Sequence, residues 1–121
     1  HELFCADAFE GMTALHASGR VFDLVVIDPP AFAKSSAEVS AAYTAYGRLM
    51  RLGLKLLVPG GDLVFASCSS RVGAATFCER MAQVAEGAGR PLQGLEMTGH
   101  AVDHPIDFPE GAYLKCLFSR A

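Results

Sequence analysis

Two apolar stretches of the chain end in side chains that could carry chemistry. In "VFDLVVIDPPAFAK" (residues 21–34), a run of branched apolar residues ends at Asp28, and two prolines and a phenylalanine follow. In "GGDLVFASCSS" (residues 60–70), a similar run ends at Cys68, which stands between two serines. A carboxylate accepts hydrogen bonds and a cysteine thiolate is a strong nucleophile. The sequence therefore predicts a site that uses both, if the fold brings the two strand ends together.

The turn after Asp28 is stiff. Proline fixes its own φ and biases the preceding residue toward extended geometry, so Pro29 and Pro30 hold Asp28 and the carbonyls that follow it in place. A rigid acceptor suits a planar, amine-bearing ring such as a nucleobase, and Phe32 could stack on that ring or form a wall beside it. The alternative is a proline-stiffened turn with a core phenylalanine.

The elements that must position these side chains alternate between strands and helices, which is typical of a mostly parallel sheet covered on both faces. "ELFCAD" is expected to be a short strand that ends at Asp7, and a helix should follow over about residues 9–17. "VFDLVVI" has the continuous apolar pattern of a central strand buried on both faces.

The second half of the chain continues this alternation. A capping box formed by Ser35 and Glu38 should start a helix, and "VPGG" should turn the chain into the strand "DLVFAS". Ser69 or Ser70 could cap the next helix, which ends near Gly89. Two final strands, near "LQGLEMTG" and "AYLKCLFSR", have no helix between them and should pair as an antiparallel hairpin. The core-facing stripe expected on the helix after Ser35 comprises Val39, Tyr43, Tyr46, Met50, Gly53 and Leu57.

Three strand ends deliver polar side chains to one edge of the predicted sheet. Asp7, Asp28 and Cys68 each follow a strand, and in open parallel sheets ligands bind outside the carboxyl ends of the strands. A single polar residue at a strand end is usually just solvated. Three in register favour a functional site.

Composition narrows the class of protein. The chain has 121 residues, enough for one core, and its net charge of −3 does not favour a stand-alone nucleic-acid binder. No apolar run is long enough to cross a membrane and no export signal precedes the first strand. The four cysteines show no metal-ligand spacing, so we expect no metal site, free thiols and a cytoplasmic location.

The motifs together resemble one enzyme family. "DPPAF" after an apolar strand resembles motif IV of class I S-adenosylmethionine-dependent methyltransferases, and "LKLLVPGGDLVFASCS" is similar to the stretch that follows it. With "SCS" and "DHPIDFPEGAYLK", the chain resembles, from Leu3 to Arg120, the C-terminal half of the bacterial 23S rRNA large-subunit 5-methylcytosine methyltransferases. The resemblance implies a Rossmann-like α/β fold, of which residues 1–121 form the C-terminal portion only, with a mostly parallel sheet and a terminal antiparallel strand.

The resemblance also implies a catalytic cysteine, Cys68. Carbon-5 of cytosine is a poor nucleophile until a thiolate adds to carbon-6, which is covalent catalysis. A helix start directly after Cys68 would favour the thiolate. The alternative for Cys68 is a small buried residue at a strand end, although flanking cap serines argue against deep burial. Cys5, Cys78 and Cys116 are expected to be structural.

Further residues receive roles from the family. Asp28 would bind the cytosine amine or ring nitrogen, and Asp7, Ala8, Asp28 and Pro29 would contact S-adenosylmethionine. For Asp7 a helix N-cap is an equal and compatible alternative. Pro30, Phe32 and His104 are candidate substrate contacts, although a solvated loop also explains His104 and Glu110.

Other parts of the family pattern are missing. The chain has no glycine-rich loop after a strand, so we treat it as a fragment whose cofactor loop and RNA-binding domain lie upstream, and we expect it to be inactive alone. Two rival functions remain: a methyltransferase acting on amines of adenine or guanine, which needs no thiol, and a non-catalytic α/β interaction module. In the family's strand order "VFDLVVI" lies beside a first strand that is missing here, so its apolar edge should be exposed and should promote dimerisation or strand exchange.

Overall fold

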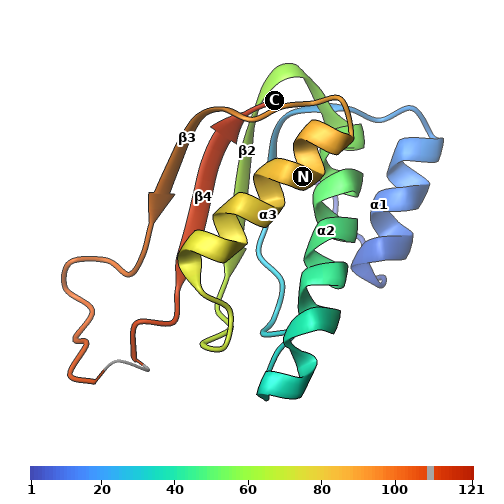
Figure 1. Ribbon diagram of the computed structural model, residues 1–121. Helices are drawn as coiled ribbons and strands as arrows, with labels where there is room; N and C mark the ends of the chain where they lie inside the picture. The colour runs from blue at the N-terminus through green and yellow to red at the C-terminus, as the bar shows by residue number, and fades with distance from the viewer. Residues whose placement is uncertain (109–110) are drawn as a thin grey trace.

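Four strands form one sheet, and three helices lie together on one of its faces (Figure 1). The computed structural model describes residues 1–108 and 111–121. The helices are α1 (Ala8–Ala17), α2 (Val39–Leu56) and α3 (Ala74–Gly87), with a short 3₁₀ turn at Ser36–Glu38; the strands are β1 (Phe22–Ile27), β2 (Leu57–Ser67), β3 (Gln93–Thr98) and β4 (Lys115–Arg120). The expected helix over about residues 9–17 is confirmed as α1.

The strand order is β1-β2-β4-β3. β1 and β2 are parallel, and β4 is antiparallel to both of its neighbours. Three strands therefore run in one direction and β4 runs against them, which confirms the mostly parallel sheet with a terminal antiparallel strand. β3 and β4 also pair antiparallel as expected, but β4 is inserted between β2 and β3, so the pair does not simply extend the edge of the sheet.

β1 is an edge strand, which agrees with the exposed edge expected for "VFDLVVI", but only one of its faces is buried, which corrects the expectation of burial on both faces. Successive side chains of a strand point to opposite faces. Val25 and Ile27 face the helices and are buried, whereas Leu24 and Val26 are 54% and 60% exposed. Because α1, α2 and α3 share one face, no helix among the described residues covers the other. The predicted pairing of copies through this edge stays a prediction.

The segment before α1 is not a strand. Residues 1–6 have no regular structure, and Leu3 and Phe4 are 89% and 64% exposed. A strand requires a neighbour to satisfy its backbone groups, and none of the described strands pairs with this segment. The expected strand "ELFCAD" is therefore not formed, although its last residue, Asp7, is the N-cap of α1.

α2 packs closely on the sheet. Tyr46, Met50 and Gly53 of the predicted stripe are buried. A Cβ atom at Gly53 would lie 2.7 Å from the Cδ1 atom of Ile27, so a larger residue would require the end of the Ile27 side chain to move. The expected turn "VPGG" lies within β2 as a bulge, between the pairs Phe22–Leu57 and Leu24–Asp62. α2 thus packs against β1, the strand that ends one residue before Asp28.

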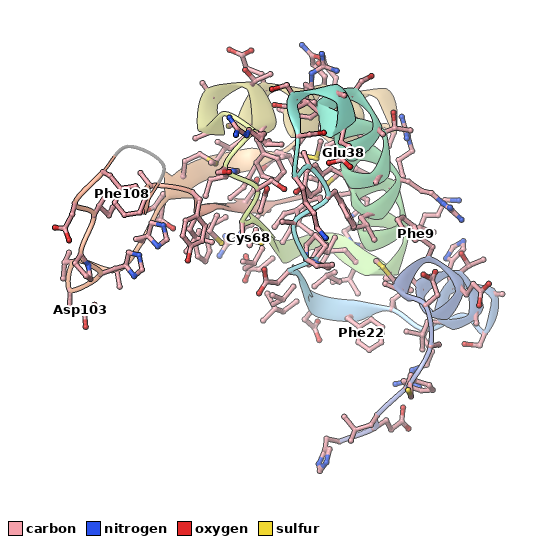
Figure 2. All side chains as sticks on the ribbon, turned by 90° about the horizontal axis from the view of Figure 1, so that it is seen from below. Phe9, Phe22, Glu38, Cys68, Asp103 and Phe108 are labelled. Carbon is pink, nitrogen blue, oxygen red and sulfur yellow. The ribbon has the colours of Figure 1, made fainter. Side chains whose placement is uncertain are left out.

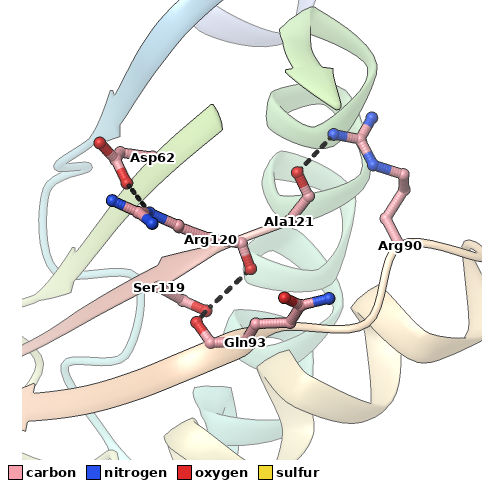
Figure 3. A network of polar contacts seen from close by, with 6 residues as sticks. All are labelled: Asp62, Arg90, Gln93, Ser119, Arg120 and Ala121. Atoms are coloured by element: carbon pink, nitrogen blue, oxygen red, sulfur yellow. Dashed lines mark hydrogen bonds and ion pairs between the residues drawn. The ribbon is translucent and has the colours of Figure 1, made fainter. Parts of the chain in front are cut away.

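Arg90 joins three elements at the end of the sheet where β2 begins and β4 ends (Figure 3). Its guanidinium donates to the carbonyl oxygens of Leu54, Leu57, Val58 and Ala121 at 3.0, 3.2, 3.0 and 2.8 Å. One side chain therefore joins the end of α2, the start of β2 and the end of β4.

The Arg90→Met variant should lower the free energy of unfolding by about 3 kcal/mol, because charge-assisted hydrogen bonds are lost and carbonyls lose their donor. Urea unfolding of the two proteins measures the difference. Arg120→Met is the matched control: Arg120 pairs with Asp62 at an exposed site, and its loss should cost under about 1 kcal/mol. Equal losses for both variants would show that Arg90 is not a clamp.

Candidate active site

Asp28 and Cys68 lie at the same end of the sheet, called here the rim. β1 and β2 are parallel neighbours, so the residues that follow them emerge side by side, and Figure 2 looks onto this rim with Cys68 labelled. The Sγ atom of Cys68 lies 3.9 Å from the carbonyl oxygen of Pro29, within reach of a weak S–H hydrogen bond. Cys68 is half-buried and Asp28 is exposed. The structure therefore brings the thiol and the prolyl turn together at an accessible place.

The two serines beside Cys68 point inward. Ser67 and Ser69 are fully buried, and the hydroxyl of Tyr46 lies 2.8 and 3.1 Å from their Oγ atoms. The N–H of Ala33 donates to Ser69 Oγ at 3.3 Å. The expectation that these serines mark an exposed cap is wrong, because Tyr46 satisfies their hydroxyls inside the core. The network joins the cysteine strand, the prolyl turn and α2, and leaves Cys68 facing outward.

The helix after Cys68 starts later than predicted. α3 begins at Ala74 with Gly73 as N-cap, and neither Ser69 nor Ser70 caps it. Helix-dipole effects fall off within the first turn. The predicted contribution of a helix N-terminus to a thiolate at Cys68 is therefore not supported by the structure.

A buried lysine that no sequence motif indicated contacts the residue after Cys68. Lys115 is 3% exposed, and its ammonium donates to the carbonyl oxygens of Ser69 and Tyr113 at 2.5 and 2.9 Å. Burial lowers the pKa of Lys115, and the charge of a Cys68 thiolate acts in the opposite direction. The sequence signal for this burial is the alternation of inward and outward side chains along β4, which places Lys115 on the inward face with Leu117 and Ser119.

The other cysteines are less suited to nucleophilic attack. Cys116 is half-buried, and burial together with the nearby charge of Asp28 raises the pKa of its thiol. Burial also raises the pKa of Cys78, with a smaller effect from Glu79. A raised pKa reduces the thiolate fraction at neutral pH. Cys5 is exposed in the irregular segment before α1, away from a strand end.

Three of the four predicted cofactor residues line one hollow. Ala8, Asp28 and Pro29 border a hollow of about 330 Å³ beside β1, together with Met12 and other apolar residues of α1, α2 and β1. The fourth, Asp7, caps α1: its Oδ1 atom accepts from the N–H groups of Phe9 and Glu10 at 2.9 and 3.2 Å. Asp7 is thus the N-cap of α1, and its predicted contact with the cofactor stays a prediction.

The substrate candidates differ in placement. Pro30 is exposed on the prolyl turn. Phe32 is half-buried, and its ring lies 5.0 Å from the ring of Tyr46, as expected for the core phenylalanine that the sequence left as an alternative.

His104 is exposed and stacks on His100, with 4.0 Å between ring centroids and 8° between planes. The Nε2 atom of His100 accepts from the N–H of Leu114 at 3.1 Å. The stack therefore connects the 99–113 loop to the start of β4. Glu110 lies outside the described residues.

Glu38 holds the far end of the prolyl turn. Its Oε2 atom accepts from the N–H groups of Lys34 and Ser35 at 2.8 and 2.9 Å, which confirms the predicted link between Ser35 and Glu38. These two backbone hydrogen bonds lower the pKa of Glu38. The folded state therefore favours the carboxylate, and the segment between Asp28 and α2 is fixed at both ends.

This contribution should depend on pH. It is complete above the unfolded value for glutamate, about 4.3, and is lost as the pH falls through the lower pKa of the folded state. In the Glu38→Gln variant the amides of Lys34 and Ser35 should exchange with solvent several-fold faster near neutral pH. Hydrogen-exchange measurements test this, with Glu79→Gln as the control on α3. Unchanged exchange in Glu38→Gln would contradict the role of the carboxylate.

Among residues 1–108 and 111–121, no helix is both long and apolar enough to cross a membrane. No group of three His, Cys, Asp or Glu side chains among them is arranged to hold a metal ion.

Solved structures share this arrangement of strands and helices. A candidate S-adenosylmethionine-dependent methyltransferase from Streptococcus mutans matches with a TM-score of 0.75 and 21% identity over 100% of this chain and 31% of its own. SMU.776, a candidate methyltransferase complexed with SAH, gives 0.72 and 21% over 96% and 30%. A methyltransferase homologue from Pyrococcus horikoshii gives 0.64 and 18% over 98% and 44%. The fold is therefore the Rossmann-like α/β fold of class I methyltransferases.

Curated proteins narrow the resemblance. The chain is 43% identical over 118 residues to a ribosomal RNA large subunit methyltransferase from Deinococcus radiodurans, covering 98% of this chain and 29% of that protein. It is 40% and 41% identical over 117 residues to ribosomal RNA large subunit methyltransferase I from Shewanella amazonensis and Aeromonas salmonicida, covering 95% of this chain and 30% of each. The resemblance to large-subunit rRNA methyltransferases is thus confirmed, although the chain spans under a third of these relatives. No family model matches the chain.

Proposed function

We propose that the protein containing this chain is an S-adenosylmethionine-dependent methyltransferase that makes 5-methylcytosine in large-subunit rRNA, and that this chain supplies the rim at which the reaction occurs. The observation that carries the proposal is the thiol of Cys68 beside the Pro29 carbonyl, at the end of two parallel strands. The similarity to rRNA large subunit methyltransferases supports the substrate class.

Cys68 would act as the nucleophile. Its thiolate adds to carbon-6 of the cytosine, a sulfur–carbon bond forms, and the electron pair of the 5,6 double bond makes carbon-5 nucleophilic. S-adenosylmethionine, when bound, supplies an electrophilic methyl group for carbon-5. Loss of the carbon-5 proton to a base then returns an electron pair to the ring. The sulfur–carbon bond breaks, and the thiolate and the aromatic ring are restored.

Asp28 would hold the cytosine. Its exposed carboxylate follows β1 directly and is stiffened by two prolines, so it can accept a hydrogen bond from the exocyclic amine at a fixed place. We propose that Pro30 borders the base on the same turn, that Phe32 supports it from below through its contact with Tyr46, and that His104 contacts the RNA from the 99–113 loop.

S-adenosylmethionine would bind beside β1. The hollow lined by Ala8, Asp28 and Pro29 is apolar with one carboxylate, which suits a heterocycle that carries an amine. Asp7 would join this set from the start of α1. We propose that residues 1–121 form the C-terminal part of a catalytic domain, with a glycine-rich cofactor loop and an RNA-binding domain upstream. We propose that the substrate is 23S rRNA and that the protein acts in the cytoplasm.

The rival amine chemistry predicts a different product. A methyltransferase acting on adenine or guanine amines would use the prolyl turn without the thiol, and an interaction module would give no product. Incubation of the complete protein with S-adenosylmethionine and unmodified large-subunit RNA, followed by nucleoside mass spectrometry, separates the three. We expect 5-methylcytidine; N-methylated purine nucleosides, or no methylated nucleoside, would contradict the proposal.

A further inference from the structure

We propose that Lys115 is a positioning residue for Cys68: its ammonium group holds the backbone that follows the thiol and places a positive charge beside a thiolate formed there. This inference rests on the proposed function of Cys68. It assigns to β4 the positive charge that the sequence had placed at the start of α3.

The position of Lys115 follows from the sheet. β4 lies beside β2, and Lys115 is the cross-strand partner of Ser67, the residue before Cys68. Its ammonium donates to the carbonyl oxygen of Ser69, the residue after Cys68. Cys68 therefore lies between two residues that Lys115 contacts, one through the strand register and one through the ammonium.

The ammonium is held in a fixed place. Lys115 is 3% exposed, and a second hydrogen bond to the carbonyl oxygen of Tyr113 restricts it further. Carbonyl oxygens satisfy the donors of an ammonium group but do not neutralise its charge. A buried cation therefore gains from an anion formed beside it, more than it would in water, because the local dielectric constant is low.

The attraction between the two groups is mutual. The charge of a Cys68 thiolate opposes the lowering of the Lys115 pKa by burial. Other titratable or charged groups near the rim are Asp28 after β1, Cys116 on β4, Arg71 after the cysteine strand, and the stacked His100 and His104 of the 99–113 loop. Lys115 differs from these groups in its hydrogen bond to the carbonyl oxygen of Ser69, the residue next to Cys68.

The test is the pH dependence of thiol alkylation in the complete protein, without RNA or cofactor. Iodoacetamide labels each cysteine at a rate that follows its thiolate fraction, and peptide mass spectrometry reports each one separately. In Lys115→Gln, which keeps hydrogen-bond donors but loses the charge, alkylation of Cys68 at neutral pH should slow about tenfold, and its pH profile should move to higher pH. Lys115→Arg, which keeps the charge, should retain the original profile.

Two controls separate charge from packing. Tyr46→Phe loosens the serines beside Cys68 without removing a charge, so it should leave the pH position of the Cys68 profile unmoved. Exposed Cys5 is an internal control that no substitution should affect. If Lys115→Gln is poorly folded by circular dichroism, Lys115→Met serves as the neutral variant. A Cys68 profile that coincides in the neutral variant and the unsubstituted protein would overturn the proposal.

The result is independent of the reaction assigned to Cys68. A displaced alkylation profile with no 5-methylcytidine formation would support the role of Lys115 and contradict the proposed function. An unmoved profile together with normal 5-methylcytidine formation would contradict the role of Lys115 and support the proposed function.

Discussion

Cys68→Ala should abolish methyl transfer to cytosine, with a loss of at least about a thousandfold in kcat. Without the thiolate, carbon-5 remains a weak nucleophile, and the remaining rim residues cannot provide the covalent step. Cys68 is half-buried at the rim and its side chain lies outside the Tyr46–Ser67–Ser69 network, so the fold should survive the change. Single-turnover methylation of large-subunit RNA by the complete protein measures the loss.

The matched control is Cys78→Ala. Cys78 is also half-buried, but it lies in α3, and burial raises the pKa of its thiol. This variant should keep most of the activity. If Cys68→Ala and Cys78→Ala were equally active, the covalent mechanism would be excluded, whereas equal inactivity would point to general damage from losing a cysteine.

Asp28→Asn should lower kcat about a hundredfold, the size expected when one preorganised electrostatic contact in the transition state is removed. The amide keeps the shape of the side chain and the two prolines keep the turn rigid, so the change removes charge with little effect on folding. Asp28 is exposed, and the free energy of unfolding should remain within about 0.5 kcal/mol of the original. Kinetics under saturating RNA and S-adenosylmethionine measure the effect on kcat.

Asp23→Asn provides the control for Asp28. Asp23 is an exposed carboxylate near the start of the same strand, far along β1 from the rim. Its loss should leave kcat unchanged. A hundredfold loss in both variants would show a general charge effect, and no loss in Asp28→Asn would remove Asp28 from the site.

The strand ends at Asp28 and Cys68 and the first two helices were predictable because local rules decide them. The apolar run before Asp28 and the capping residues Ser35 and Glu38 require only their own neighbourhood, and both occur where expected. Parallel pairing of β1 and β2 then places Asp28 and Cys68 at one rim without further information. This part of the site followed from the order of the elements.

The errors arose where a residue's role depends on partners distant in the sequence. "ELFCAD" has strand-forming residues, yet no described strand pairs with it. Serines are common helix caps, but Tyr46, about twenty residues earlier, draws Ser67 and Ser69 inward. Lys115 in a strand suggests an exposed side chain, and only the insertion of β4 beside β2 turns it toward Ser69. Each of these roles depends on the tertiary pairing of the strands.

The measurement that tests the central claim most directly is covalent trapping with large-subunit RNA in which 5-fluorocytidine replaces cytidine. Fluorine at carbon-5 cannot leave as a proton does, so the bond between sulfur and carbon-6 should persist after methyl transfer. We expect a protein–RNA complex that survives denaturation, requires S-adenosylmethionine, and maps by peptide mass spectrometry to Cys68. A complex linked through Cys116, or no complex under conditions in which unmodified RNA is methylated, would contradict the account.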